Sequence, residues 1–146
     1  MITERTRTNL NRARLELEKA RKILINLDNL PDSSIKVYIE NLLSAMNLVS
    51  QVILEFQRGG VSDSYAATFE DVNKEILRKM ALEEKLYDFY FYLKNMTLKK
   101  LHRTADGITI SSWKSSKTFS KEKLKSFYDN VERLVYNVTR LLSQRA

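Results

Sequence analysis

Cysteine is absent from this chain of 146 residues, and the sequence has only three glycines and one proline. The lack of thiols excludes disulfides, thiolate zinc sites and cysteine nucleophiles. With so few turn-forming residues and 43% hydrophobic residues, the composition is typical of long helices and argues against a turn-rich β-sandwich. The length fits a single domain, residues 1–146, that can form a core without metal ions or disulfides.

Histidine is almost as scarce, because His102 is the only one in the sequence. A metal site in a helical bundle typically uses Glu-x-x-His pairs, and a zinc site collects three or four nitrogen or sulfur ligands. The sequence contains neither set, no glycine-rich phosphate loop and no nucleophile elbow. We therefore predict no metal and no cofactor, and we favour a protein without catalytic activity. Metal-independent proton transfer by His102 is the one catalytic alternative.

Long hydrophobic runs are also missing. The N-terminal stretch MITERTRTNLNRAR is charged and unlike a signal peptide. We expect no window to reach the roughly 20 apolar residues that a helix needs to span a bilayer. These features predict a soluble cytoplasmic protein that does not contact a membrane.

What the sequence has in quantity is helical periodicity. Apolar residues recur at alternating gaps of three and four, which places them on one face of a helix. We predict four such helices: residues 10–27, a second from Ser33 or Ser34 to Gly59–Gly60, a third from Phe69 to near His102, and a last one after Ser120. The fold class expected from this pattern is all-α, an up-and-down antiparallel four-helix bundle.

A different pattern separates the third predicted helix from the fourth. In the insert TADGITISSWKSSKTF, residues 104–119, Asp106 and Gly107 predict a turn, and Ile108 and Ile110 alternate with threonine. We predict a short hairpin or an ordered loop at this point in the bundle.

Charge is distributed unevenly along the chain, whose formal net charge is +7. Residues 93–125 contain nine Lys or Arg and two Asp or Glu. The net charge of this segment therefore equals the net charge of the whole chain. Such a segment attracts phosphates by counterion release, and aromatic rings near it can stack on unpaired bases. Because no groove-reading helix motif occurs, we predict binding of nucleic acid, RNA rather than DNA, or of nucleotide phosphates. The predicted binding residues are Lys94, Lys99, Lys100, His102, Arg103, Trp113, Lys114, Lys117, Lys121 and Lys125.

Five aromatic rings cluster in the third predicted helix, in the stretch YDFYFYL. Rings at these positions point to several sides of a helix, so they cannot all face one core. Either the helix packs on two neighbours, or some of the rings face another chain, because tyrosine is enriched at interfaces. The candidate interface residues are Tyr87, Tyr90 and Phe91, which would form a homodimer or dock a regulatory protein partner.

The order of these parts resembles the HEPN family, small helical bundles found in nucleotide- and RNA-related proteins. The resemblance covers most of the chain: a charged first helix, the apolar second helix SSIKVYIENLLSAMNLVSQVILEF, a long third helix, and the link ADGITISSW...KTFSKEKLKSF into the fourth. It implies a single HEPN-like helical domain.

Ribonucleases of this family carry Arg, often followed by Asn, and then His after four to six further residues. Here Lys94-Asn95 takes the place of Arg-Asn, and His102 follows at a longer spacing. On one continuous helix, Lys94 and His102 would lie about 80° apart around the axis and about 12 Å apart along it. The resemblance therefore implies a member without the ribonuclease motif. A protein-interaction partner is the first alternative function, and a metal-independent ribonuclease using His102 with Lys94 or Arg103 is the second.

Overall fold

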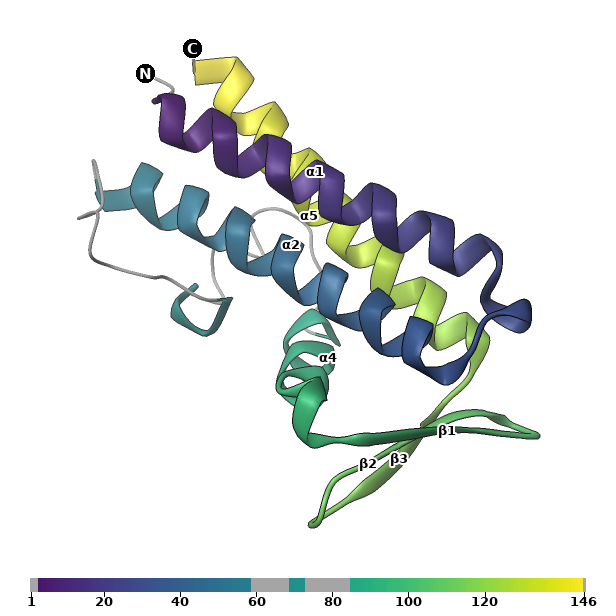
Figure 1. The fold of residues 1–146 in the computed structure, drawn as a ribbon. Coiled ribbons are helices and arrows are strands. Elements are labelled where there is room, and N and C mark those ends of the chain that lie inside the picture. Colours follow the sequence, from purple (N-terminus) through teal and green to yellow (C-terminus); the bar gives the residue numbers. More distant parts are fainter. Residues whose placement is uncertain (1–2, 59–68, 73–84, 146) are drawn as a thin grey trace.

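Three long helices dominate the structure, and a small sheet lies at one end of them (Figure 1). The computed structural model describes residues 3–58, 69–72 and 85–145. The long helices are α1 (Glu4–Ile25), α2 (Asp32–Arg58) and α5 (Lys121–Arg145). A 3-10 turn, Leu27–Asn29, joins α1 to the antiparallel α2, and α5 packs along both. The two termini lie at the end of this layer that is remote from the sheet.

The apolar stripe predicted for the first helix is confirmed as a core face. Thr3 caps α1, because its side-chain oxygen accepts a hydrogen bond from the Thr6 N–H at 3.0 Å. Along the buried face leucine alternates with alanine, and Ala13 and Ala20 are fully buried. Alanine at these positions lets a neighbouring helix approach closely, which brings the leucines into the core.

Helix α2 packs against both α1 and α5 and is buried along most of its length. Tyr38 is completely buried, and its O–H donates to the carbonyl oxygen of Leu124 on α5 at 2.6 Å. Burial raises the pKa of Tyr38 well above the ordinary tyrosine value. Contrary to our expectation, the segment Asp32–Phe56 is long and apolar enough to cross a membrane. In this fold 67% of its most apolar window is buried, as in the core helix of a globular protein.

Helix α4 (Lys85–Leu93) divides its aromatic rings between two neighbours. Tyr87 and Tyr90 pack on Phe69, with ring centroids 4.8 and 5.1 Å away. On another side of the helix, Phe89 and Tyr92 pack on Phe119 of the sheet, and Phe89 also packs on Phe127 of α5. The ring centroids of these pairs are 5.2 to 6.3 Å apart. The aromatic run is therefore the packing element that joins the sheet to the helices.

The predicted third helix is wrong beyond Leu93. It ends there because Asn95 adopts the left-handed conformation, with φ 63°, which asparagine tolerates and which closes a helix C-terminus. Where the third helix is predicted to begin, the structure has a 3-10 turn, Phe69–Asp71. Another 3-10 turn, Met96–Leu98, leads from α4 into the sheet. Residues 73–84 of the predicted third helix lie outside the described residues. The predicted end of the second helix, at Gly59–Gly60, lies outside them as well.

A three-stranded antiparallel sheet in the order β1-β2-β3 follows α4. Its strands are β1 (Lys100–Thr104), β2 (Gly107–Ser111) and β3 (Ser116–Phe119). The all-α prediction is therefore wrong, because the described residues combine four α-helices with this sheet. The segment LKKLHR contains good helix formers, but Leu101 and Arg103 pair with Ile110 and Ile108 of the next strand. This pairing outweighs the local helix propensity.

The pleat of the sheet creates an inner face and an outer face. Ile108, Ile110 and Phe119 on the inner face are buried against the helices. Gly107 begins β2 with φ 144°, and a Cβ atom there would lie 2.3 Å from the carbonyl oxygen of Phe119. Only glycine allows β2 and β3 to pair this closely at that point. The outer face carries polar residues from all three strands, namely Lys100, His102, Thr109, Ser111, Ser116 and Thr118.

Candidate nucleic-acid interface

One end of the sheet collects four lysines from three segments. Lys100 lies opposite Ser111, and Ser111 lies opposite Ser116, so the start of β1 meets the ends of β2 and β3 that flank their turn. Lys99 precedes β1, and Lys100 is its first residue. Lys114 lies in the β2–β3 turn, and Lys117 is on β3. We call these four residues the lysine cluster.

The ring of Tyr92 on α4 positions two members of the lysine cluster. Lys99 Nζ lies 4.8 Å and Lys117 Nζ lies 5.3 Å from the centroid of this ring. Tyr92 is itself fixed, because its O–H donates to the carbonyl oxygen of Ile110 at 2.8 Å. A cation over an aromatic face gains about 0.5 to 1 kcal/mol at an exposed site. The ring thus draws together two ammonium groups that repel each other.

The positive charge of the lysine cluster has no carboxylate partner among residues 3–58, 69–72 and 85–145. Three of its members are exposed, and Lys99 is half-buried. Burial lowers the pKa of Lys99, and the charge of nearby Lys94 lowers this pKa further. An anion placed here would offset the repulsion between the lysines, so the cluster favours anion binding.

An exposed ring and a row of hydroxyls accompany the charge. Trp113 in the β2–β3 turn is 88% exposed, with Lys114 Nζ 4.6 Å from the centroid of its ring. On the outer face the hydroxyl oxygens of Thr109 and Thr118 are 2.8 Å apart, and exposed His102 pairs with Thr109 in the sheet register. Such a surface offers a stacking platform together with hydrogen-bonding groups for phosphate or sugar oxygens.

Arg103, a predicted binding residue, faces the opposite direction. It follows His102 on β1, so its side chain points to the inner face. Its guanidinium donates to the carbonyl oxygens of Leu27, at 2.8 Å, and Leu30, and its Nε lies 3.2 Å from Asp32 Oδ1. Arg103 therefore attaches the sheet to the connection between α1 and α2.

Two more predicted binding residues are engaged in ion pairs. Lys94 Nζ lies 2.5 Å from Glu70 Oε1, and Lys121 at the start of α5 pairs with Asp28. Lys125 is exposed, one turn further along α5. Of the ten predicted residues, the lysine cluster and Trp113 therefore lie at one end of the sheet. The register places Lys117 beside Ile110 on the inner face, and Lys100 with His102 on the outer face.

The three ribonuclease candidates do not share one site. His102 and Arg103 point to opposite faces of β1, and the Lys94 ammonium group is held by Glu70. The helical spacing between Lys94 and His102 does not apply, since the helix ends at Leu93, before both residues.

Two of the three candidate interface residues lie in the core. Tyr87 and Tyr90 are 6% and 4% exposed, and the Tyr87 O–H donates to the carbonyl oxygen of Val72. Phe91 is 47% exposed. Only this ring of the three faces outward.

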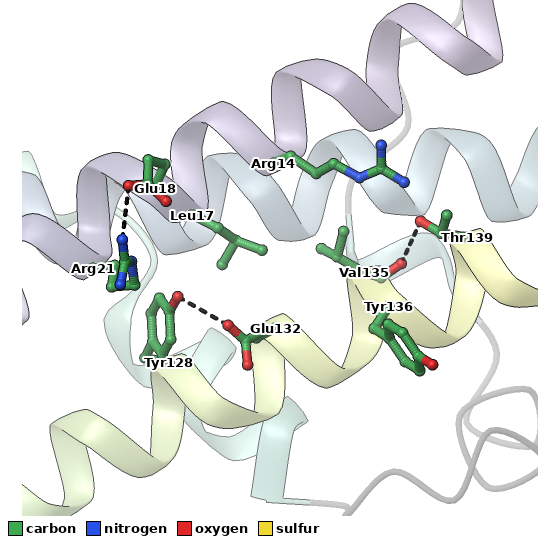
Figure 2. Close-up of a pocket in the computed structure, with 9 residues that line it drawn as sticks. All are labelled: Arg14, Leu17, Glu18, Arg21, Tyr128, Glu132, Val135, Tyr136 and Thr139. Carbon is green, nitrogen blue, oxygen red and sulfur yellow. Dashed lines mark hydrogen bonds and ion pairs between the residues drawn. The ribbon is translucent and has the colours of Figure 1, made fainter.

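A groove of about 550 Å³ lies between α1 and α5 (Figure 2). Most of its polar groups are already satisfied. Arg21 donates to Glu18 at 3.0 Å, and the Tyr128 O–H donates to Glu132 at 3.0 Å. Burial, followed by this bond to Glu132, raises the pKa of Tyr128 to about 12. Arg14 and Tyr136 are the only lining residues whose polar groups have no partner among the described residues, so this groove is a weaker candidate than the sheet.

A second hollow, of about 450 Å³, lies between α2 and the turn that leads into β1. We call it the α2 cleft. Its walls are formed by Glu40, Leu43, Ser44, Asn47, Leu48, Gln51, Asn95, Met96 and Thr97.

Two features of this region were not recognised in the sequence. Tyr92 was not among the predicted site residues, although its aromatic ring lies only two residues before Lys94. The polar residues Glu40, Ser44, Asn47 and Gln51 recur at gaps of four, three and four along an otherwise apolar helix, which is a readable signal for a polar stripe.

The described residues contain no group of three or more His, Cys, Asp or Glu side chains that could hold a metal ion. No protein-family model matches the chain, and no curated protein or solved structure is significantly similar to it. The functional inference therefore depends on the residues of this chain alone.

Proposed function

We propose that the protein binds single-stranded nucleic acid, RNA in preference to DNA, through the lysine cluster and Trp113. One observation carries this proposal. Four lysines gather at one end of the sheet without a carboxylate partner in the described part of the chain, whereas Lys94, Arg103 and Lys121 of the same basic segment each have one.

Each part of the surface has a role in this function. The lysine cluster neutralises phosphates and releases their counterions. Trp113 stacks on a base, which requires an unpaired strand because duplex bases are already stacked. The exposed hydroxyls of Ser116 and Thr118 on the outer face donate to phosphate or sugar oxygens.

The other functions have less support in the geometry. A ribonuclease needs an acid, a base and an electrostatic stabiliser at one scissile phosphate, and His102, Lys94 and Arg103 are not assembled in that way. A docking partner would find Phe91 exposed but Tyr87 and Tyr90 in the core. The resemblance to HEPN bundles stays a prediction, and nucleic-acid binding does not depend on it.

The test compares two triple variants that lose the same charge. The first changes Lys100, Lys114 and Lys117 to Ala, all exposed at the sheet. The control changes exposed cations near the termini, Arg7, Arg12 and Arg140, to Ala. Affinity for a fluorescent 12-nucleotide uridine strand is measured by anisotropy at 50 mM salt.

We expect the sheet variant to lose about tenfold or more in affinity, because it removes phosphate contacts, and the control to lose about threefold or less, because only long-range attraction changes. Equal losses in the two variants would show that net charge, and not this surface, attracts the strand. No measurable binding by the unmodified protein would refute the proposed function.

A further inference from the structure

The α2 cleft has the size and the hydrogen-bonding groups of a binding site for a flat, polar molecule. Its floor is apolar, since Leu43, Leu48 and Met96 are 8%, 7% and 2% exposed. Polar groups rise around that floor from two sides. One side is the stripe on α2 that contains Glu40 and Asn47, and the other is the turn after α4. A hollow that combines an apolar floor with a few placed polar groups is the usual form of a small-ligand site.

The orientation of the Asn47 amide is fixed by its neighbours. Its Oδ1 accepts hydrogen bonds from the Phe69 N–H at 3.0 Å and from the Tyr90 O–H at 3.1 Å. Because a backbone N–H can only donate, the oxygen of the amide must face Phe69. The Nδ2 group then has no hydrogen-bond partner among the described residues, and Asn47 is one of the residues that line the cleft.

Glu40 supplies the complementary acceptor. It is exposed, it lines the same cleft, and its carboxylate has no ion pair or hydrogen bond within the described residues. Glu40 is also the one formally charged group in the lining. A phosphate would be repelled by this charge, whereas an N–H group of a neutral ligand would be attracted.

The cleft lies next to the surface proposed to bind the nucleic-acid strand. Thr97 on its wall precedes Lys99 by two residues and Lys100 by three. Three residues span at most about 10 Å of extended chain. A strand whose phosphates contact these lysines can therefore place a base over the cleft.

We propose that the α2 cleft binds one unpaired nucleobase of the strand held by the lysine cluster, with Asn47 Nδ2 donating to the base and the Glu40 carboxylate accepting from it. This inference rests on the proposed function and adds a base-reading position to it. Trp113 stacks on any base, but a pocket with one oriented donor and one acceptor distinguishes among bases.

Two isosteric substitutions test this assignment. Asn47→Asp keeps the oxygen that accepts from Phe69 and Tyr90 but replaces the free donor with an acceptor. Glu40→Gln removes the negative charge and half of the acceptor capacity at an exposed position, where loss of the fold is not expected. The matched control is Glu4→Gln, at the end of α1 that is remote from the sheet. Thermal unfolding of all four proteins checks that they are folded.

The readout is the affinity for five 12-nucleotide strands of equal charge, the four homopolymers and an abasic strand, with heparin as a polyanion without bases. We expect the unmodified protein to prefer one homopolymer by about tenfold, the worth of one good base-edge contact. The Glu40→Gln and Asn47→Asp variants should each change this preference about tenfold and leave heparin binding within about twofold. Glu4→Gln should change neither quantity.

The outcomes separate the two proposals. Binding of all strands and heparin with a base preference that neither cleft variant changes would refute the cleft assignment and leave the proposed function standing. Failure to bind any strand, including at 50 mM salt, would refute both. A shift of the Asn47 side-chain amide resonance on adding the preferred homopolymer, but not the abasic strand, is the direct signature that we expect.

Discussion

Arg103 and Lys100 are two cations of β1 that the structure assigns to opposite roles, and changing each to Met tests this assignment. Arg103 makes three contacts with the connection between α1 and α2, while Lys100 is exposed on the outer face. The structure predicts that Arg103→Met destabilises the fold and that Lys100→Met weakens nucleic-acid binding. The two variants lose the same charge and receive the same side chain, so each is the control of the other.

The magnitude follows from the contacts of Arg103. Hydrogen bonds to a charged donor contribute about 1.5 to 3 kcal/mol each when buried. This side chain is 34% exposed, so solvent screening reduces the total, and we expect a loss of about 2 kcal/mol for the whole set. A loss of that size lowers the Tm by about 4 to 8 °C in a protein of this length. Lys100→Met changes an exposed site and should shift the Tm by less than about 2 °C.

Thermal unfolding followed by circular dichroism measures the first effect, and anisotropy with the uridine 12-mer measures the second. We expect the folded Arg103→Met protein to keep its affinity within about twofold and Lys100→Met to lose about three- to tenfold. The assignment is refuted if Lys100→Met destabilises the protein as much as Arg103→Met does. It is equally refuted if folded Arg103→Met loses as much affinity as Lys100→Met.

Three further predictions concern the fold. Tyr38→Phe removes the hydrogen bond to the buried carbonyl of Leu124 and should cost about 0.5 to 1.5 kcal/mol in urea unfolding. Gly107→Ala should cost about 3 kcal/mol or more by the same assay, because its Cβ would collide with the backbone of Phe119. Tyr128 should ionise with a pKa of about 12 by absorbance at 295 nm. Because this folded pKa is above the unfolded value of about 10, the stability contributed by Tyr128 is complete below pH 10 and is lost as the pH rises towards 12.

Each of these has a contradicting result. Tyr38→Phe with unchanged stability would show that the hydrogen bond from Tyr38 to Leu124 contributes nothing to the stability of the fold. Normal stability of Gly107→Ala would mean that β2 and β3 separate at that point at little cost. An ordinary tyrosine titration in place of the raised one would show that Tyr128 is solvated in the groove.

The sequence predicts the long helices well because their evidence is local. The periodic leucines and alanines of α1 and the periodic apolar residues of α2 are buried in the core, as their spacing predicts. The error after Leu93 arises because LKKLHR has good helix formers and becomes a strand only when β2 pairs with it. Asn95, the residue that closes α4, was visible in the sequence but is compatible with helix as well. The alternation of Ile108 and Ile110 was the signal that a partner strand was needed.

The site was predictable as a segment but not as a surface. Composition places nine cations in residues 93–125, and no local rule says which of them find acids from elsewhere in the chain. Arg103 meets Asp32 and Lys121 meets Asp28 only because β1 ends and α5 begins beside the connection between α1 and α2. Conversely, Tyr92 joins Lys99 to Lys117 across a distance of 18 residues in the sequence. The tertiary structure therefore decides which cations of this segment form ion pairs and which stay without a carboxylate partner.

The salt dependence of RNA affinity tests the central claim most directly. For a single strand, the slope of log affinity against log salt falls by about 0.7 for each phosphate contact that is removed. We predict that the triple variant of Lys100, Lys114 and Lys117 has a slope smaller in magnitude by about 2 than the unmodified protein, and that the control variant of Arg7, Arg12 and Arg140 keeps the original slope. Identical slopes for the unmodified protein and the sheet variant would contradict the claim that the lysine cluster contacts the phosphates.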